Sequence, residues 1–326
     1  MPVQILLAVA GLALLTVAAD HLVLGSSRLA RRLRISPVVV GVVVIGFGTS
    51  APELLVSGVA AARGDTGIAV GNIVGSNILN LTLILGVAAL IAPVAVTSEV
   101  LRREVPLAVG AVAAFALLAW AGLGWVTGTV LAAATLGALA LLVRWARQTP
   151  GNQELAADVA EFTEAPAALD VPTPPRRLPE WFEPVRAVVG LAGVLAGAQL
   201  LVANASAIAA DLGVSQVLIG FTVVAVGTSL PELVTAVQAQ RHDESELLVG
   251  NLFGSNLFNS LAAGSVVGFA SGAAESATVG VSLLVAMLLI GGFAWALLRR
   301  GLTLTRVEGA VLLGAYALTL PMLLSG

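Results

Sequence analysis

Two glutamates, Glu53 and Glu232, lie inside segments that are otherwise largely apolar. A carboxylate at membrane depth is costly unless it is paired with a base, protonated or holding a cation. Neither apolar stretch contains a basic residue that could pair with its glutamate. Each glutamate is therefore a candidate for binding a cation.

Both glutamates end a short motif that occurs twice in the chain. Residues 48–53 read GTSAPE and residues 227–232 read GTSLPE, while residues 71–77 read GNIVGSN and residues 250–256 read GNLFGSN. Every match falls at one offset of 179 residues, without a gap. Acidic groups at matched positions of a repeat suggest one shared site at the repeat interface, which is the usual layout of a secondary transporter.

The first motif can expose oxygen ligands, because a proline interrupts its helix. Pro52 and Pro231 cannot donate a backbone hydrogen bond, so carbonyls are released one turn earlier. Such carbonyls cannot face lipid, but they can bind a cation. Side chains three and four residues apart share a helix face, so we expect the hydroxyls before each glutamate to join it. These hydroxyls belong to Thr49, Ser50, Thr228 and Ser229.

The second motif adds neutral ligands. Ser76 and Asn80 are four residues apart, as are Ser255 and Asn259, so each pair shares one helix face. Hydroxyl, amide and carboxylate oxygens suit a hard cation such as Na⁺ or Ca²⁺, and not zinc or copper. Glycines four residues apart should let helices pack closely; they are Gly71 and Gly75, and Gly250 and Gly254. The other asparagines should tie interrupted backbone together; they are Asn72, Asn77, Asn251 and Asn256.

The composition is that of a helical membrane protein. Apolar residues make up 58% and charged residues 11%, against about 25% charged in soluble domains. The chain has no basic patch, which argues against nucleic acid as a partner. It has no cysteine and none of the motifs H-E-x-x-H or G-x-S-x-G, so we expect neither an enzyme nor a bound cofactor. No obligate protein partner is indicated.

Apolar segments of spanning length predict ten transmembrane helices. Five precede a Pro-rich acidic stretch and five follow it, so a repeat of five spans must insert its second copy inverted. The predicted segments are roughly 3–30, 36–62, 67–92, 102–121, 125–147, 184–211, 215–240, 246–270, 276–298 and 304–325. The expected domains are a first five-helix repeat at 1–147, a linker at 148–183 and a second, inverted repeat at 184–326.

Arginine placement predicts the orientation. All 16 basic residues are arginine, and with this span count only Arg63 lies outside, which is a strong positive-inside bias. We therefore expect an inner-membrane protein with both termini outside and the linker in the cytoplasm. Asp20, His21 and His242 lie near span ends and are interpreted as structural.

The paired motifs resemble the α-repeats of the sodium/calcium exchangers, most closely the short prokaryotic members. The resemblance implies ions held at mid-membrane by the second, third, seventh and eighth helices. The first and sixth helices would slide across that core. Glu53 and Glu232 would be shared by Ca²⁺ and the counter-ion, with oxygens from Thr49, Ser50, Thr228 and Ser229. Ser76 and Ser255 would line Na⁺ sites, and Asn80 matches an asparagine common in the family.

One position departs from the family pattern. Where sodium/calcium exchangers often carry aspartate in the eighth span, this chain has Asn259. The predicted function is Ca²⁺/Na⁺ antiport, and the alternative is proton-coupled exchange of Ca²⁺ or another divalent cation, because buried glutamates can carry protons. A passive cation channel is a third possibility, but an inverted repeat with broken helices favours alternating access.

Overall fold

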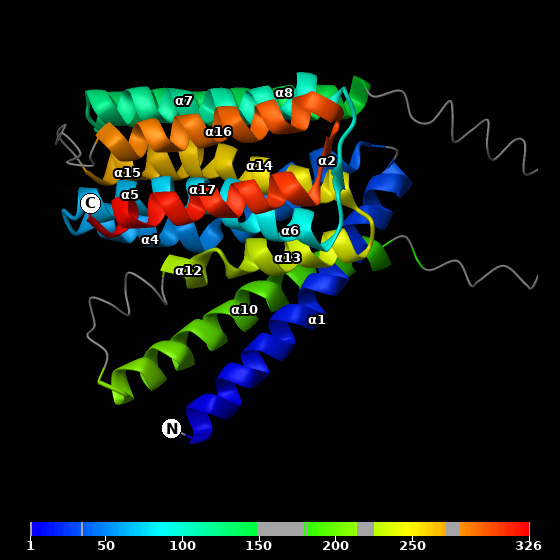
Figure 1. The fold of residues 1–326 in the computed structure, drawn as a ribbon, viewed down its shortest axis with the longest axis horizontal. Coiled ribbons are helices and arrows are strands. Elements are labelled where there is room, and N and C mark those ends of the chain that lie inside the picture. Colours follow the sequence, from blue (N-terminus) through cyan, green and yellow to red (C-terminus); the bar gives the residue numbers. More distant parts are fainter. Residues whose placement is uncertain are drawn as a thin grey trace, which may run out of the picture.

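The computed structural model describes residues 2–33, 35–148, 179, 181–213, 225–271 and 281–325, and these residues are almost entirely helical. The acidic linker expected at 148–183 lies almost wholly outside the described residues, as do the starts of the segments expected at 215–240 and 276–298. Figure 1 shows a bundle of roughly parallel helices with two long helices, α1 and α10, leaning away from it.

Each of the ten predicted segments contains helix among its described residues, although Leu304 lies in a strand. The first half comprises α1 (Pro2–Leu33), α2 (Pro37–Val40), η1 (Gly41–Gly46), α3 (Phe47–Thr49), α4 (Ala51–Ala62), α5 (Thr66–Leu79), η2 (Asn80–Ile84), α6 (Leu85–Ile91), β1 (Val94–Ala95), η3 (Val100–Arg102), α7 (Glu104–Ala121) and α8 (Trp125–Gln148). The second half comprises α10 (Phe182–Asp211), α12 (Ala225–Thr228), α13 (Leu230–Arg241), α14 (Ser245–Phe258), η5 (Asn259–Ala263), α15 (Gly264–Ala270), α16 (Val281–Gly301), β2 (Thr303–Leu304) and α17 (Arg306–Ser325).

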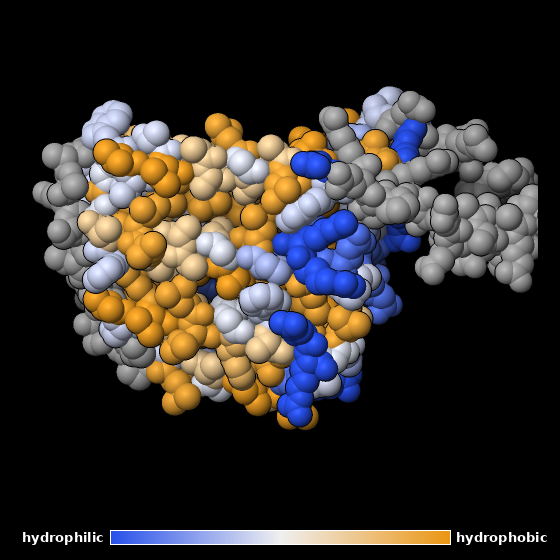
Figure 2. All heavy atoms as spheres, turned by 90° about the horizontal axis from the view of Figure 1, so that it is seen from above, coloured by the Kyte–Doolittle hydropathy of each residue, from blue (hydrophilic) through white to orange (hydrophobic). Residues whose placement is uncertain are grey.

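Six helices of the described residues are long and apolar enough to cross a membrane, and a bent seventh is formed if 37–49 and 51–62 make one span. The six are 2–33, 66–91, 100–121, 125–146, 182–211 and 281–301. Large apolar side chains such as Leu6, Leu55, Leu136 and Leu289 are exposed, and Figure 2 shows hydrophobic residues over most of the visible face. A surface this apolar is typical of a protein that contacts lipid or a partner protein.

The two long helices α1 and α10 pack on each other along most of their length. Glycines permit this contact, because a Cβ at Gly197 would lie 2.5 Å from the backbone nitrogen of Leu15 and one at Gly190 would lie 2.6 Å from that of Leu22. Backbones this close favour dispersion contacts that larger residues would prevent. The two helices therefore form a tight pair.

Helix α14 lies at the centre of the bundle, and its residues 247–258 are all buried. A Cβ at Gly250 would lie 2.4 Å from the carbonyl oxygen of Val38, and one at Gly254 would lie 2.7 Å from the Cα of Val42. The close approach predicted for this glycine pair is confirmed. A Cβ at Gly71 or Gly75 would meet no other atom within 4 Å among the described residues, and the counterparts of Val38 and Val42 in the second copy, 217 and 221, lie outside them.

Polar contacts gather at the end of the molecule where α1 ends and α10 begins. There β1 pairs with β2 in antiparallel register, Val94 opposite Leu304, and Arg306 donates to the Ile91 carbonyl at 3.2 Å. The Nε2 of His242 lies 2.6 Å from Asp20 Oδ1, which joins α13 to α1. Figure 2 shows hydrophilic side chains gathered at this end. In Figure 1, α1 begins and α17 ends toward the opposite end.

Candidate ion-binding site

The two GTSxPE motifs form matching helix breaks in the middle of the bundle. Helix α3 ends at Thr49 and α4 begins at Ala51, and the helical segments 37–49 and 51–62 are bent by 44° relative to each other. Ser50 between them has φ −77° and ψ 2°, and Ser229 in the second copy has φ −92° and ψ 6°. The proline two residues later has no N–H for the turn before it, so the helix is interrupted there. The predicted breaks are confirmed.

Both glutamates are completely buried, each in the first turn of the helix after the break. Ser229 Oγ donates to Glu53 Oε1 at 3.2 Å, and Thr228 also faces that carboxylate. In the mirror arrangement, Thr49 and Ser50 face the carboxylate of Glu232. The two carboxylates are near enough to interact electrostatically. The two repeated motifs therefore meet at one place.

The sequence places each glutamate on one helix face with the hydroxyls of its own segment, but its carboxylate contacts hydroxyls of the other copy. The described contacts pair Glu53 with hydroxyls of the second copy and Glu232 with hydroxyls of the first. The physical reason is the break itself, because a 44° bend between Thr49 and Ala51 removes the continuous helix that the i, i+4 rule requires. Thr49 instead donates to the carbonyl of Ile45 at 3.0 Å.

The serines of the second motif are placed unequally. Ser255 Oγ is buried and lies 3.4 Å from Glu232 Oε1 and 3.3 Å from the carbonyl oxygen of Gly46. Its counterpart Ser76 is buried on α5 and makes no side-chain hydrogen bond of this kind among the described residues. Only Ser255 of the two therefore contacts the glutamate pair directly in this conformation, within the part of the chain that the structure describes.

The asparagines of the second motif connect the two copies. Asn80 Nδ2 donates to Asn256 Oδ1 at 2.9 Å, and Asn256 Nδ2 donates to the carbonyl of Asn77 at 3.0 Å. Asn72 Nδ2 contacts the carbonyl of Glu53 at 3.5 Å and Ser57 Oγ at 3.0 Å. Of the four asparagines predicted to tie backbone, Asn72 and Asn256 thus donate to backbone carbonyls, whereas the side chains of Asn77 and Asn251 contact other side chains.

Two features of the site could not be found by matching motifs alone. The helices widen into π-helical turns that begin at Asn80 and at Asn259, the two asparagines predicted as ligands. Such turns release local backbone hydrogen bonds and are frequent at functional sites.

The side chain of Asn251 joins Thr49 to Thr235, with distances of 3.3 Å and 2.9 Å. The spacing of residues within one helix gives no signal for this contact, because Thr49 and Asn251 are 202 residues apart.

Several buried oxygens around the glutamates have no hydrogen-bond partner among the described residues. They are Glu53 Oε2, Glu232 Oε2, Ser50 Oγ, Asn80 Oδ1 and Asn259 Oδ1. An unpartnered buried polar atom is costly, so a cluster of them calls for an explanation. The nitrogen Asn259 Nδ2 is also unpartnered among the described residues, but the oxygens are the ligands that Na⁺ and Ca²⁺ prefer. The donor set therefore fits a hard cation.

Comparison with known proteins agrees with this chemistry. The sequence profile of the family described as sodium/calcium exchanger protein matches residues 3–145 and 183–324. The putative antiporter CaxA of Alkalimonas amylolytica is 39% identical over 315 residues, covering 94% of each chain. The sodium/calcium exchanger MaX1 of Methanosarcina acetivorans is 30% identical over 280 residues, covering 79% of this chain and 80% of that one.

The fold also matches a solved exchanger. A structure of the sodium-calcium exchanger NCX_Mj soaked with Na⁺ and Sr²⁺ aligns with a TM-score of 0.81 at 29% identity, covering 98% of this chain and 97% of that one. The profile match spans both halves of the chain, and the described helices include several that can cross a membrane. The chain is thus a multi-pass membrane antiporter that belongs to the sodium/calcium exchanger family.

Proposed function

We propose that this antiporter exchanges Ca²⁺ for Na⁺ at one site centred on Glu53 and Glu232. The observation that carries the proposal is the pair of fully buried carboxylates, each with one oxygen that has no partner among the described residues. Two negative charges balance one Ca²⁺ or two Na⁺. The other proposed ligands are Thr49, Ser50, Ser76, Asn80, Thr228, Ser229, Ser255 and Asn259.

Competition for these carboxylates would couple the two ions. The same oxygens cannot satisfy Ca²⁺ and Na⁺ together, so one ion must leave before the other enters. An empty site would carry two uncompensated charges in a dry interior, which is strongly unfavourable. The protein should then switch between its outward-open and inward-open forms only when an ion occupies the site. Each ion that crosses must therefore be exchanged for another, which is antiport.

We further propose ten spans arranged as two inverted five-helix repeats, 1–147 and 184–326. Supporting this, the breaks at Ser50 and Ser229 and the π-helical turns at Asn80 and Asn259 recur at the 179-residue offset. The pair α1 and α10 would slide over the remaining helices. The arginine-rich end, with the linker at 148–183, would face the cytoplasm and both termini the outside.

The proposed function is tested by ⁴⁵Ca²⁺ uptake into proteoliposomes. Vesicles preloaded with Na⁺ are diluted into Na⁺-free buffer, beside a matched set that carries only a pH gradient. We expect uptake that requires internal Na⁺. Uptake without any trans ion would indicate a channel, and uptake driven only by the pH gradient would contradict Na⁺ coupling.

Proton coupling is the second candidate, and Asn259 is the residue that favours it. Asn259 is fully buried, and neither its Oδ1 nor its Nδ2 has a hydrogen-bond partner among the described residues. A neutral amide here leaves two carboxylates at the site. Two carboxylates can release a divalent cation by binding two protons, so Na⁺ would not be required.

Asn259→Asp separates the two coupling ions. If a missing third carboxylate sets the coupling, the added charge should increase the dependence of Ca²⁺ uptake on internal Na⁺. The measurement is the ratio of uptake with a Na⁺ gradient to uptake with only a pH gradient. Asn256→Asp is the matched control, because Asn256 is equally buried but its amide is already hydrogen-bonded to Asn77. An unchanged ratio in Asn259→Asp would remove Asn259 from the explanation.

A further inference from the structure

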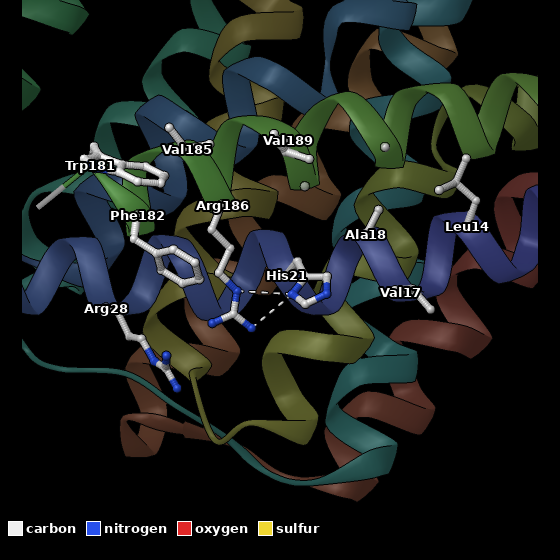
Figure 3. Close-up of a pocket in the computed structure, with 12 residues that line it drawn as sticks. Leu14, Val17, Ala18, His21, Arg28, Trp181, Phe182, Val185, Arg186 and Val189 are labelled. Carbon is white, nitrogen blue, oxygen red and sulfur yellow. Dashed lines mark hydrogen bonds between the residues drawn. The ribbon is translucent and has the colours of Figure 1, made fainter. Parts of the chain in front are cut away.

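An open groove of about 730 Å³ runs between the long helices α1 and α10. Its walls come from one face of each helix, at spacings of three, four and seven residues. Leu14 and Val17 line it from α1, and Val185 and Val189 line it from α10 (Figure 3). These four side chains are substantially exposed. The groove is therefore apolar along most of its length.

The groove lies on the side of the pair that faces away from the bundle. On α1, the carbonyl of Thr16 accepts a hydrogen bond from Gln238 of α13, so that face contacts the bundle. On α10, Leu191 packs where Gly48 leaves room for it. Leu14 and Val189 are each two residues from these contacts, about 200° around the helix. In a multi-pass membrane protein, this outward face meets lipid.

One end of the groove is basic. Arg28 and Arg186 line it there, and both lie near the carboxylate of Glu183, at 3.2 Å and 3.8 Å. Arg186 also contacts His21 Nδ1 through two nitrogens at 3.1 Å each (Figure 3). Two arginines against one carboxylate leave one positive charge, and the Arg28 side chain is 51% exposed. An anion could therefore reach the Arg28 guanidinium.

Trp181 stands at the same end and is exposed. Tryptophan is enriched where a membrane protein meets the headgroup region, because its ring is both apolar and polar. Along α1, Leu14 and Arg28 are separated by 14 residues, or about 21 Å at 1.5 Å per residue. One leaflet including its headgroups is roughly 20–22 Å thick. The apolar wall, the tryptophan and the arginines thus follow the layout of one lipid molecule.

We propose that this groove is a binding site for an anionic phospholipid of the leaflet on the arginine-rich side. The phosphate would bind Arg28, with Arg186 behind it, and an acyl chain would lie along Val185, Val189 and Leu14. Arg28 is the group that favours an anionic headgroup over a zwitterionic one. The apolar walls come from both α1 and α10, so a bound lipid would contact both helices of the pair.

Native mass spectrometry of the full chain tests the proposal. The protein in detergent is incubated with phosphatidylglycerol and phosphatidylcholine that carry the same acyl chains, and retained lipid is counted. We expect phosphatidylglycerol to be retained preferentially. Arg28→Gln should weaken its binding about fivefold, because one basic residue near an anionic surface contributes about 1 kcal/mol. Val189→Trp should weaken it by filling the groove, with no change in charge.

Two variants on α16 serve as matched controls. Arg299 and Val285 are exposed, as Arg28 and Val189 are, but they do not line the groove. Arg299→Gln and Val285→Trp should retain phosphatidylglycerol as the unaltered protein does. Equal retention of the two lipids would overturn the proposal. Equal retention in Arg28→Gln and Arg299→Gln would overturn the headgroup assignment, and full retention in Val189→Trp would overturn the placement of the acyl chain. Thermal melts of all four variants report whether each is folded.

Discussion

Replacing either Glu53 or Glu232 by glutamine is expected to abolish Ca²⁺ exchange while the protein still inserts and folds. Glutamine keeps the shape of the side chain and an oxygen that can accept the hydrogen bond from Ser229 or Ser255. It removes one of the two charges that balance a divalent cation. Removing one partner from a buried pair of opposite charges, here a carboxylate that would face Ca²⁺, costs about 3–5 kcal/mol. Exchange should therefore fall roughly 10²-fold or more.

The measurement is initial ⁴⁵Ca²⁺ uptake in proteoliposomes, normalised to the amount of inserted protein. Glu104→Gln is the matched control, since Glu104 is also a buried glutamate with an oxygen that lacks a partner among the described residues. Glu104 lies in the first turn of α7, and its charged neighbours are Arg103, Glu99 and Glu246. It should keep near-normal exchange. Exchange at the normal rate in Glu53→Gln or Glu232→Gln would remove the glutamates from the ion site.

Much of the helix arrangement along the chain could be predicted from the sequence, because apolar length and proline position act locally. The break near Ser50 follows from Pro52, and the close packing of α14 follows from Gly250 and Gly254. Both glutamates could be selected as candidates for the same reason, since a carboxyl in an apolar run is conspicuous whatever its neighbours are. These features can be predicted without knowing which helices pack against one another.

The partners of the glutamates could not be predicted, because they come from the other half of the chain. Ser229 reaches Glu53 across 176 residues, and Asn80 reaches Asn256 across the same separation. Periodicity relates side chains on one helix only. The π-helical turns at Asn80 and Asn259 were missed for a different reason, because a shift from i+4 to i+5 hydrogen bonds depends on surrounding packing and has no residue signature.

The contacts of α1 suggest which surfaces must separate during transport. Toward the bundle, α1 is joined to the end of α13 through Asp20 and His242, and beyond α13 through Ser27 and Arg31, which both contact Glu244. Toward α10, it is joined by glycine packing and by Gln4, whose amide nitrogen Nε2 donates to Asp211 Oδ2 at 3.2 Å. If α1 and α10 slide as one pair, the first set must break and the second must persist.

A reversible crosslink between α1 and α13 should therefore stop exchange. The chain has no cysteine of its own, so Asp20→Cys combined with His242→Cys supplies the only two thiols. A short bifunctional methanethiosulfonate reagent can bridge them, because the two native side chains meet at 2.6 Å. We expect ⁴⁵Ca²⁺ uptake to fall in proportion to the crosslinked fraction and to recover on reduction with dithiothreitol.

Gln4→Cys combined with Asp211→Cys is the matched control, because its bridge joins α1 to α10 within the pair. A crosslink there should leave exchange unchanged, since neither residue would move relative to the other. Loss of exchange on bridging 4 to 211 would mean that the two helices move separately. Continued exchange in protein fully bridged from 20 to 242 would mean that α1 stays fixed to the bundle, and access to the glutamate pair would have to change through another set of helices.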